Sequence, residues 1–478
     1  MSEFNGPAQD IFGRSLFFAC SAVALYTGYQ LVIAIYNVWF HPLASFPGPR
    51  IAAATQIPYV KAPTWSGYRL LSCHFIDASA WHDIHGHHAD AQPFEKDPRL
   101  NVKCFNNVDN LFTAKHEDHE RMRKVLGHAF SERAIKEQEP TVQLYIEKLI
   151  HRLHEQISSS SQAKVDMVKW YDWLSFDIID LTFGSSFKCL ETQANHWWVD
   201  MVFGSIEAIV FMGACHRFTI SRTLLTYLIP KRYKKMFEDH WKATEETLAC
   251  RIKLGTNRHD FMSPILENNI DGKGLNRHEM LSNAWHFINA GSGTTAGILS
   301  ATVYFLARDP KILSIITAEL PYLLYCLSET NRIMPVVLMS QAVLVPPRGA
   351  TICGYWVPGN TGVTNNQYAC YRSKTNFKNP DNDVPERWLD DPDYVSDQRQ
   401  VLQPFSYGAR NCIGKRQVTP PFLGTMELQL ALARTIWNFD VGICEESAMD
   451  WDDQKVYMIW KKTPLIIRLA ASTQAKSH

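Results

Sequence analysis

The feature that most constrains this chain is a turn-rich loop at residues 404–415, in which Cys412 stands between two glycines. A thiolate can occupy one axial position of a haem iron, and it pushes electron density toward the opposite side, where O–O cleavage occurs. Gly408 and Gly414 would leave the backbone free to adopt positive φ and to approach a flat macrocycle closely. Phe405 would shield the sulfur from water. The loop therefore predicts a haem-thiolate site.

The remaining part of the pattern is Arg410, a fixed cation that would pair with a haem propionate. The alternative is that Cys412 is one ordinary buried cysteine among the eleven of the chain. The complete spacing Phe-x-x-Gly-x-Arg-x-Cys-x-Gly favours the ligand. It resembles the haem-ligating signature of the cytochrome P450 family. This resemblance implies a cytochrome P450 fold, mainly α with small β-sheets, and Cys412 as the axial ligand of haem b.

Composition excludes several other classes of protein. The 48 basic and 48 acidic residues give a formal charge of zero, which offers no sign of a nucleic-acid partner. The cysteines are scattered without a C-x-x-C pair, which argues against a disulfide framework or a zinc site and for a reducing compartment. The 478 residues permit two domains or one large, cofactor-filled domain.

The N-terminus carries a second strong signal. No charged residue occurs from Ser15 to Phe40, and this stretch supplies the ~20 apolar residues that a bilayer requires. A cleaved signal peptide is the alternative, but the apolar region is long and lacks a clear small-residue cleavage site. The distribution of the few flanking charges predicts that the main domain stays cytoplasmic.

A proline-rich connector follows the apolar stretch. Pro42, Pro47 and Pro49 make it stiff and extended. It resembles the hinge that separates membrane-bound members of the family from their anchor. The expected organisation is an N-terminal segment and anchor at 1–40, a hinge at 41–50 and a haem-thiolate catalytic domain at 51–478. The resemblance implies a single-pass protein of the endoplasmic reticulum membrane.

Residues 279–309 predict one long helix that ends at Asp309-Pro310. Glycines in its middle cost about 1 kcal/mol each relative to alanine, so they require a reason. The stretch resembles the oxygen-activating motif of the family, Ala/Gly-Gly-x-Asp/Glu-Thr-Thr. The matching positions are Ala290, Gly291, Thr294 and Thr295.

The acidic position of that motif holds Gly293. In the family this carboxylate helps to feed protons to the bound oxygen, and Thr294 positions the water that delivers them. Either Thr294 and water suffice in this chain, or turnover is slow or uncoupled.

Residues 116–136 predict a helix with one buried face. On it, His119 and Arg123 lie one turn apart and would point at the same anionic group. A solvated helix face is the alternative. In the family, a Trp or His with an Arg four residues later contacts a haem propionate, which implies this role for His119 and Arg123.

A second set of charges is expected to be structural. Glu329 and Arg332 are three residues apart and would share a helix face. With Pro385-Glu386-Arg387-Trp388 they resemble the Glu-x-x-Arg and Pro-Glu-Arg-aromatic set of the family, in which Arg387 completes a buried salt-bridge network. Residues 296–328 look shorter than in membrane-bound relatives.

The remaining segments predict helices and a small sheet. Amphipathic stretches at 142–153, 171–183 and 198–211 contain aromatic residues that suit either a substrate roof or plain core. Residues 350–357 and 361–364 predict a hairpin around Pro358-Gly359-Asn360. Residues 423–439 predict a helix and 456–469 a closing strand pair. Residues 417–422 look inserted after the cysteine loop, and their two prolines should end or restart the helix there.

Two hypotheses follow for function. The first is a membrane-anchored monooxygenase that oxidises a small hydrophobic substrate with O2 and electrons from NADPH-cytochrome P450 reductase. Fungal relatives with this hinge and loop act on polycyclic terpenoids, polyketides or alkaloids of secondary metabolism, which implies such a substrate. The second, suggested by Gly293 and the short region, is a haem-binding relative with weak or lost oxygenase activity.

Overall fold

The structure is a computed structural model, and it describes most of the 478 residues. The described residues are 6–44, 46–48, 50–54, 72–87, 93–98, 105–159, 162–179, 184, 186–216, 230–256, 258, 260–269, 274–415, 423–448, 451 and 453–472.

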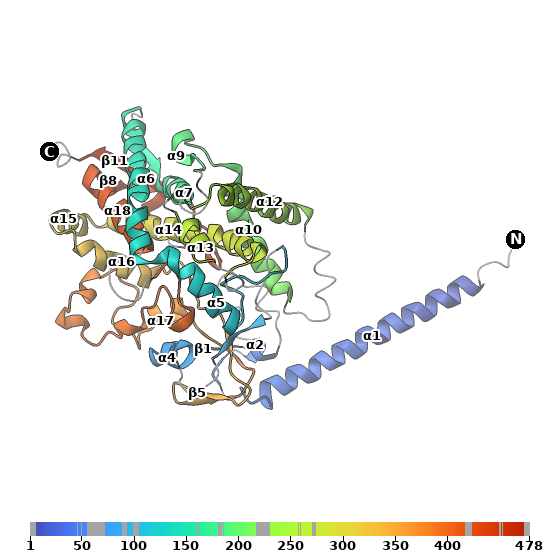
Figure 1. The fold of residues 1–478 in the computed structure, drawn as a ribbon. Helices are drawn as coiled ribbons and strands as arrows, with labels where there is room; N and C mark the ends of the chain where they lie inside the picture. Colours follow the sequence, from blue (N-terminus) through green and yellow to red (C-terminus); the bar gives the residue numbers. More distant parts are fainter. Residues whose placement is uncertain are drawn as a thin grey trace.

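The N-terminal helix α1 (Gly6–Trp39) extends away from the folded body (Figure 1). Its segment Arg14–Trp39 has a mean hydropathy of 1.7, and none of the most apolar stretch is buried in the protein. A helix of 26 residues spans about 39 Å, which exceeds the ~30 Å hydrocarbon core of a bilayer. The helix is therefore long and apolar enough to cross a membrane, as the sequence predicted.

Helices form most of the body. Their bounds are α2 (Arg50–Ala54), α4 (Ser79–His85), α5 (His116–Gly127), α6 (Glu132–Ser159), α7 (Met167–Ile178), α9 (Cys189–Thr192), α10 (Trp197–His216), α12 (Lys231–Lys253), α13 (Met262–Glu267), α14 (Arg277–Arg308), α15 (Pro310–Ala318), α16 (Tyr322–Ile333), α17 (Gln367–Tyr371), α18 (Leu423–Asn438) and α19 (Glu445–Ala448).

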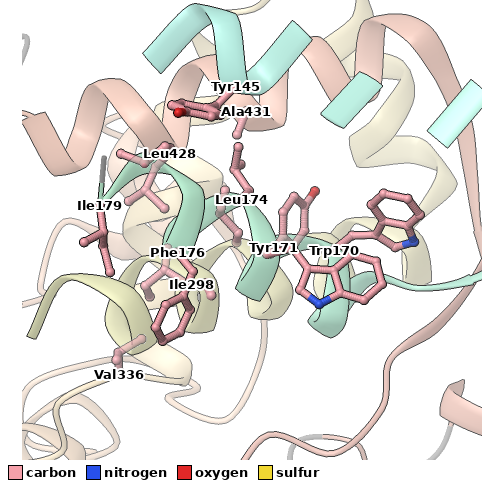
Figure 2. Packing of buried hydrophobic residues seen from close by; sticks show 14 of the residues in the cluster. Tyr145, Trp170, Tyr171, Leu174, Phe176, Ile179, Ile298, Val336, Leu428 and Ala431 are labelled. Atoms are coloured by element: carbon pink, nitrogen blue, oxygen red, sulfur yellow. The ribbon is translucent and has the colours of Figure 1, made fainter. Parts of the chain in front are cut away.

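The central element is α14, which packs against α7, α12, α16 and α18 (Figure 1). Asn276 caps its start: the Asn276 side chain accepts from the Glu279 backbone N–H, and the Glu279 carboxylate accepts from that of Asn276. Figure 2 shows Phe176 of α7, Ile298 of α14 and Leu428 of α18 within one packed cluster of side chains. This apolar core fixes where the middle of α14 lies.

Short strands complete the fold. They are β1 (Ser72–Phe75), β2 (Glu95–Lys96), β3 (Lys164–Asp166), β4 (Val343–Leu344), β5 (Ala350–Ile352), β6 (Tyr355–Val357), β7 (Gly362–Asn365), β8 (Phe439–Ile443), β9 (Val456–Tyr457), β10 (Ile459–Trp460) and β11 (Ile466–Ala471). A four-stranded sheet has the order β1-β7-β4-β2, with β1 and β7 parallel, and a three-stranded antiparallel sheet has the order β3-β11-β8. The mainly helical fold with small sheets confirms the expected fold class.

The predicted hairpin around Pro358-Gly359-Asn360 is wrong. The turn lies at Cys353 and Gly354, which both have positive φ, and it joins β5 to β6. After the Pro358 turn the chain leaves this pair, and β7 instead adds to β1 and β4. The prediction of which residues form strands was correct. The neighbours of β7, however, are set by segments that are distant in the sequence.

Three other boundaries differ from the prediction. The helix expected at 116–136 ends at Gly127, a short 3₁₀ turn follows, and Ser131 then accepts a hydrogen bond at the start of α6. The long helix α14 begins at Arg277, two residues before the expected start. The closing strand pair consists of β9 and β10 alone, because β11 pairs with β3 and β8.

The expected salt-bridge network of α16 is formed, and its three main members are fully buried. The Glu329 carboxylate forms ion pairs with the guanidinium groups of Arg332, at 2.8 Å, and of Arg387, at 3.0 Å. The indole N–H of Trp388 donates to the same carboxylate at 3.0 Å. Arg387 also pairs with Asp397, so the network joins α16 to the meander that precedes the cysteine loop.

We expect Arg387→Ala to destabilise the protein strongly, because it leaves the buried carboxylates of Glu329 and Asp397 short of their cation. Removing one partner from a buried ion pair costs about 3–5 kcal/mol. Urea denaturation of the variant should show this loss. Arg133→Ala is the control, since Arg133 pairs with Glu137 on the surface and its loss should leave the midpoint nearly unchanged. Equal midpoints for Arg387→Ala and the wild type would contradict the structural role.

Candidate active site

The cysteine loop is held by its own backbone. The N–H of Cys412 donates to the carbonyl of Phe405 at 2.9 Å, and the carbonyl of Cys412 accepts from Lys415 at 3.1 Å. Cys412 is exposed, although the protein atoms around its sulfur exclude enough water to raise the pKa of the thiol. The backbone N–H groups of Gly414 and Lys415 oppose this rise by hydrogen bonding to the sulfur. Such amide donors are what an axial thiolate needs.

The two glycines of the loop have different reasons to be there. Gly408 has a φ of +75°, and a Cβ built on it would lie 1.7 Å from the carbonyl oxygen of His85 in α4. Gly414 does not have positive φ, contrary to the sequence-based expectation, and a Cβ there would lie 3.6 Å from the Cys412 sulfur. Gly408 therefore permits the loop to rest on α4, and Gly414 keeps the surroundings of the sulfur uncrowded.

Helix α5 is tied directly to this loop. Arg123 donates to the Asn411 carbonyl at 2.7 Å and also to the Asn411 side chain. Arg410 donates to the Ala114 carbonyl at 2.8 Å and pairs with Glu95 at 3.1 Å. Residues that are almost 300 positions apart in the sequence thus meet beside the cysteine loop.

Basic side chains crowd together beside the loop. Burial, followed by the charges of Arg410 and Lys96, lowers the pKa of His119 to about 3. Burial and the charge of Arg410 also lower the pKa of Lys96 well below its usual value. The Lys96 ammonium donates to the Phe112 carbonyl and lies 4.1 Å from the centre of its ring, on which His286 stacks.

The crowding of basic side chains beside the loop favours the binding of an anion there. The basic side chains of the cluster are Lys96, His119, Arg123, His286 and Arg410. Glu95 partly offsets the charge of Lys96 and Arg410. The cluster fits the two propionates of a haem, because a carboxylate near such cations would relieve their repulsion. Lys96 and His286 were missed from the sequence, where neither belongs to a recognisable pattern.

The middle of α14 presents an open face. Ala290 and Gly291 are exposed, whereas most of this helix is buried, and a Cβ added at Gly291 would meet no atom within 4 Å. The Thr294 hydroxyl donates to the Ala290 carbonyl at 2.7 Å, the bond to the residue four positions earlier that helical threonines often make. The Cys412 thiol and this stretch of α14 are thus both accessible, as a haem packed against them would require.

Among the aromatic residues that suit either a substrate roof or plain core, Trp198 and Trp197 differ in burial. Trp198 of α10 is buried, and its indole N–H donates to His240 of α12, which also contacts Asn289 of α14 at 2.9 Å. Trp197 is 55% exposed. Phe203, Phe211 and Phe218 lie outside the residues whose side chains are described. The interpretation as plain core therefore holds for Trp198.

Comparison with known proteins decides the family. The family model described as Cytochrome P450 matches residues 75–468. The chain belongs to the cytochrome P450 family. Cytochrome P450 monooxygenase lcsI of Purpureocillium lilacinum is 36% identical over 94% of this chain and 93% of its own length. Trichothecene C-15 hydroxylase of Fusarium sporotrichioides is 33% identical over 92% and 96%. Averantin hydroxylase of Dothistroma septosporum is 31% identical over 94% and 90%.

The protein is accordingly a P450 monooxygenase, and the haem that this family binds fits the residues described above. The part of the chain that the structure describes contains no group of three His, Cys, Asp or Glu side chains that could hold a bare metal ion. The insertion predicted at 417–422 lies outside the described residues, and α18 is described from Leu423.

We expect Gly408→Ala to lower haem retention in this P450, since the added Cβ would overlap the His85 carbonyl and displace the loop. The haem-to-protein absorbance ratio after purification measures the effect. Gly442→Ala in β8 is the matched control, because its Cβ meets no atom within 4 Å. A Gly408→Ala protein that retains haem as well as this control would show that the close approach is not needed.

Proposed function

We propose that this P450 hydroxylates a hydrophobic polycyclic secondary metabolite such as a terpenoid, polyketide or alkaloid, with Cys412 as the axial ligand of haem b. The observation that carries the proposal is the exposed Cys412 thiol, which receives backbone hydrogen bonds and is tied to α5 through Asn411. The cationic cluster would bind the propionates through Arg410, Arg123 and His119. Phe405 would cover the sulfur.

When bound, the haem supplies oxygen activation and C–H oxidation. The chain's own residues then orient the substrate and supply protons. Ala290 and Gly291 provide the space along α14, and the hydroxyl of Thr294 would hold a water at the open face. Because this hydroxyl already donates to the Ala290 carbonyl, its lone pairs remain available to accept from that water. Thr295 follows on the side of the helix that faces α18.

The substrate class is supported by the relatives. Two of them are named as hydroxylases, one for averantin and one for the C-15 position of a trichothecene. The apolar helix α1 supports a single-pass anchor, which we place in the endoplasmic reticulum membrane with the catalytic domain on the cytoplasmic side. Electrons would come from NADPH-cytochrome P450 reductase.

Incubation of the full-length protein with this reductase, NADPH and a panel of polycyclic terpenoids, polyketides and alkaloids tests the proposal. We expect one class to yield a product with a mass increase of one oxygen, and we expect the oxygen to carry ¹⁸O when ¹⁸O2 is supplied. Cys412→Ser should abolish the product, because an alcohol cannot replace the electron-donating thiolate.

Haem incorporation without any O2-dependent product across the panel would contradict the substrate assignment. It would favour a haem-binding relative with weak or lost activity, the reading that Gly293 suggests. A product that formed equally well with Cys412→Ser would contradict the ligand assignment.

A further inference from the structure

The segment that precedes α5 covers the first half of α14 and stops beside its open face. The Leu111 N–H donates to the side chain of Asn283 at 2.8 Å. Nearly one turn further along α14, the ring of Phe112 stacks on the ring of His286, with the ring centres 4.8 Å apart. Among the described residues this cover ends there, because Ala290, one turn after His286, is exposed. His286 therefore lies at the rim of the open face.

Helical spacing places His286 in line with the residues of the open face. Residues four positions apart lie on the same side of a helix, so His286, Ala290 and Thr294 follow one another along α14. With a rise of 1.5 Å per residue, His286 and Thr294 are about 12 Å apart along the helix axis. A rigid polycyclic substrate that lies along the open face, with its reacting carbon near Thr294, would extend toward His286.

The His286 ring brings hydrogen-bonding groups to this rim. Burial and the charge of Lys96 lower its pKa to about 4, so the ring is neutral under physiological conditions and has one donor and one acceptor nitrogen. Among the described residues, none forms a hydrogen bond with either ring nitrogen. The core histidine His240 differs, because its two ring nitrogens contact Trp198 and Asn289. A ligand that supplied the missing partner to His286 would gain affinity, since a polar group removed from water without one is unfavourable.

His286 stands at the edge of the cationic cluster that suits the propionates. The charges of Arg410 and Lys96 lower the pKa of His119, and His286 has no part in that effect. The Phe112 ring contacts both the Lys96 ammonium and the His286 ring, so His286 belongs to the side of the cluster that borders α14. A neutral imidazole in this place suits an uncharged oxygen, whereas the permanent cations of the cluster suit carboxylates.

We propose that His286 hydrogen bonds to a substrate oxygen remote from the oxidised carbon, and hence that the substrate is a polycycle that already carries a hydroxyl or carbonyl group. A carbonyl oxygen would accept from the ring N–H, and a hydroxyl group would donate to the other ring nitrogen. The stack with Phe112 holds the plane of the imidazole for this contact. The inference rests on the proposed function, because it concerns the substrate of the same site.

The first test uses the wild-type holoenzyme and matched pairs of polycyclic ligands. Each pair consists of an oxygenated member of the panel and the analogue that lacks the remote hydroxyl or carbonyl group. The shift of the haem Soret band during titration gives a Kd for each ligand without requiring turnover. We expect the oxygenated member of at least one pair to bind about 10-fold more tightly, because its analogue leaves the imidazole unpaired. Equal Kd values within every pair would overturn the proposal.

The second test removes the hydrogen-bonding atoms from the ring position. His286→Leu should reduce the preference for the oxygenated ligand to within about 2-fold, mainly by weakening that ligand, while the Kd of the analogue changes little. His286→Asn keeps a donor and an acceptor and should recover part of the preference. His154→Leu is the matched control, since His154 of α6 is also half-buried and packs on an aromatic ring, that of Phe439, at 4.4 Å. An unchanged preference in His286→Leu would overturn the proposal.

Haem content separates a contact with substrate from a role in holding the cofactor. Both His286 variants should retain as much haem as His154→Leu, as measured by the haem-to-protein absorbance ratio. Loss of haem from both His286 variants would overturn the proposal, because it would assign the ring to the propionates. The proposed function fails in a different way: a wild type that binds the oxygenated ligands in these titrations but forms no product from them would count against that function and not against this contact.

Discussion

The attachment of the cysteine loop to α5 is the interaction on which the rest of the site depends. Arg123 binds both the carbonyl and the side chain of Asn411, the residue immediately before Cys412. On its other side the loop rests on α4 at a point where only a glycine fits. The sulfur is thus positioned by contacts from two helices that lie far away in the sequence, and the network around Glu329 secures the meander that leads into the loop.

The electrostatic character of the site follows from this packing. Bringing α5 to the loop also brings His119 and Arg123 beside Arg410, and β2 adds Lys96. Burial and the charges of neighbouring cations lower the pKa of His119 and Lys96, so an anion beside the cluster would stabilise their charged forms. A cofactor with two carboxylates would convert this repulsion into binding energy, which couples haem binding to the stability of the site.

Much of this arrangement was predictable from the sequence, because its motifs are local. The spacing around Cys412 and the Glu329–Arg332 pair indicate the loop and the network from the sequence alone, and the network is formed as expected. Partners chosen by distant packing were not predictable. The β7 strand was assigned to the wrong neighbour, and Lys96 carries no sequence pattern, since its role arises only from burial and from the charged side chains packed around it.

The central claim is that Cys412 is the haem ligand, and the carbon monoxide difference spectrum of the reduced full-length protein tests it most directly. The account predicts the red-shifted Soret band that a thiolate ligand produces, and it predicts that Cys412→Ala, reconstituted with haem, lacks this band. A folded, haem-supplemented wild-type protein without the band would contradict the account, as would a Cys412→Ala protein that still showed it.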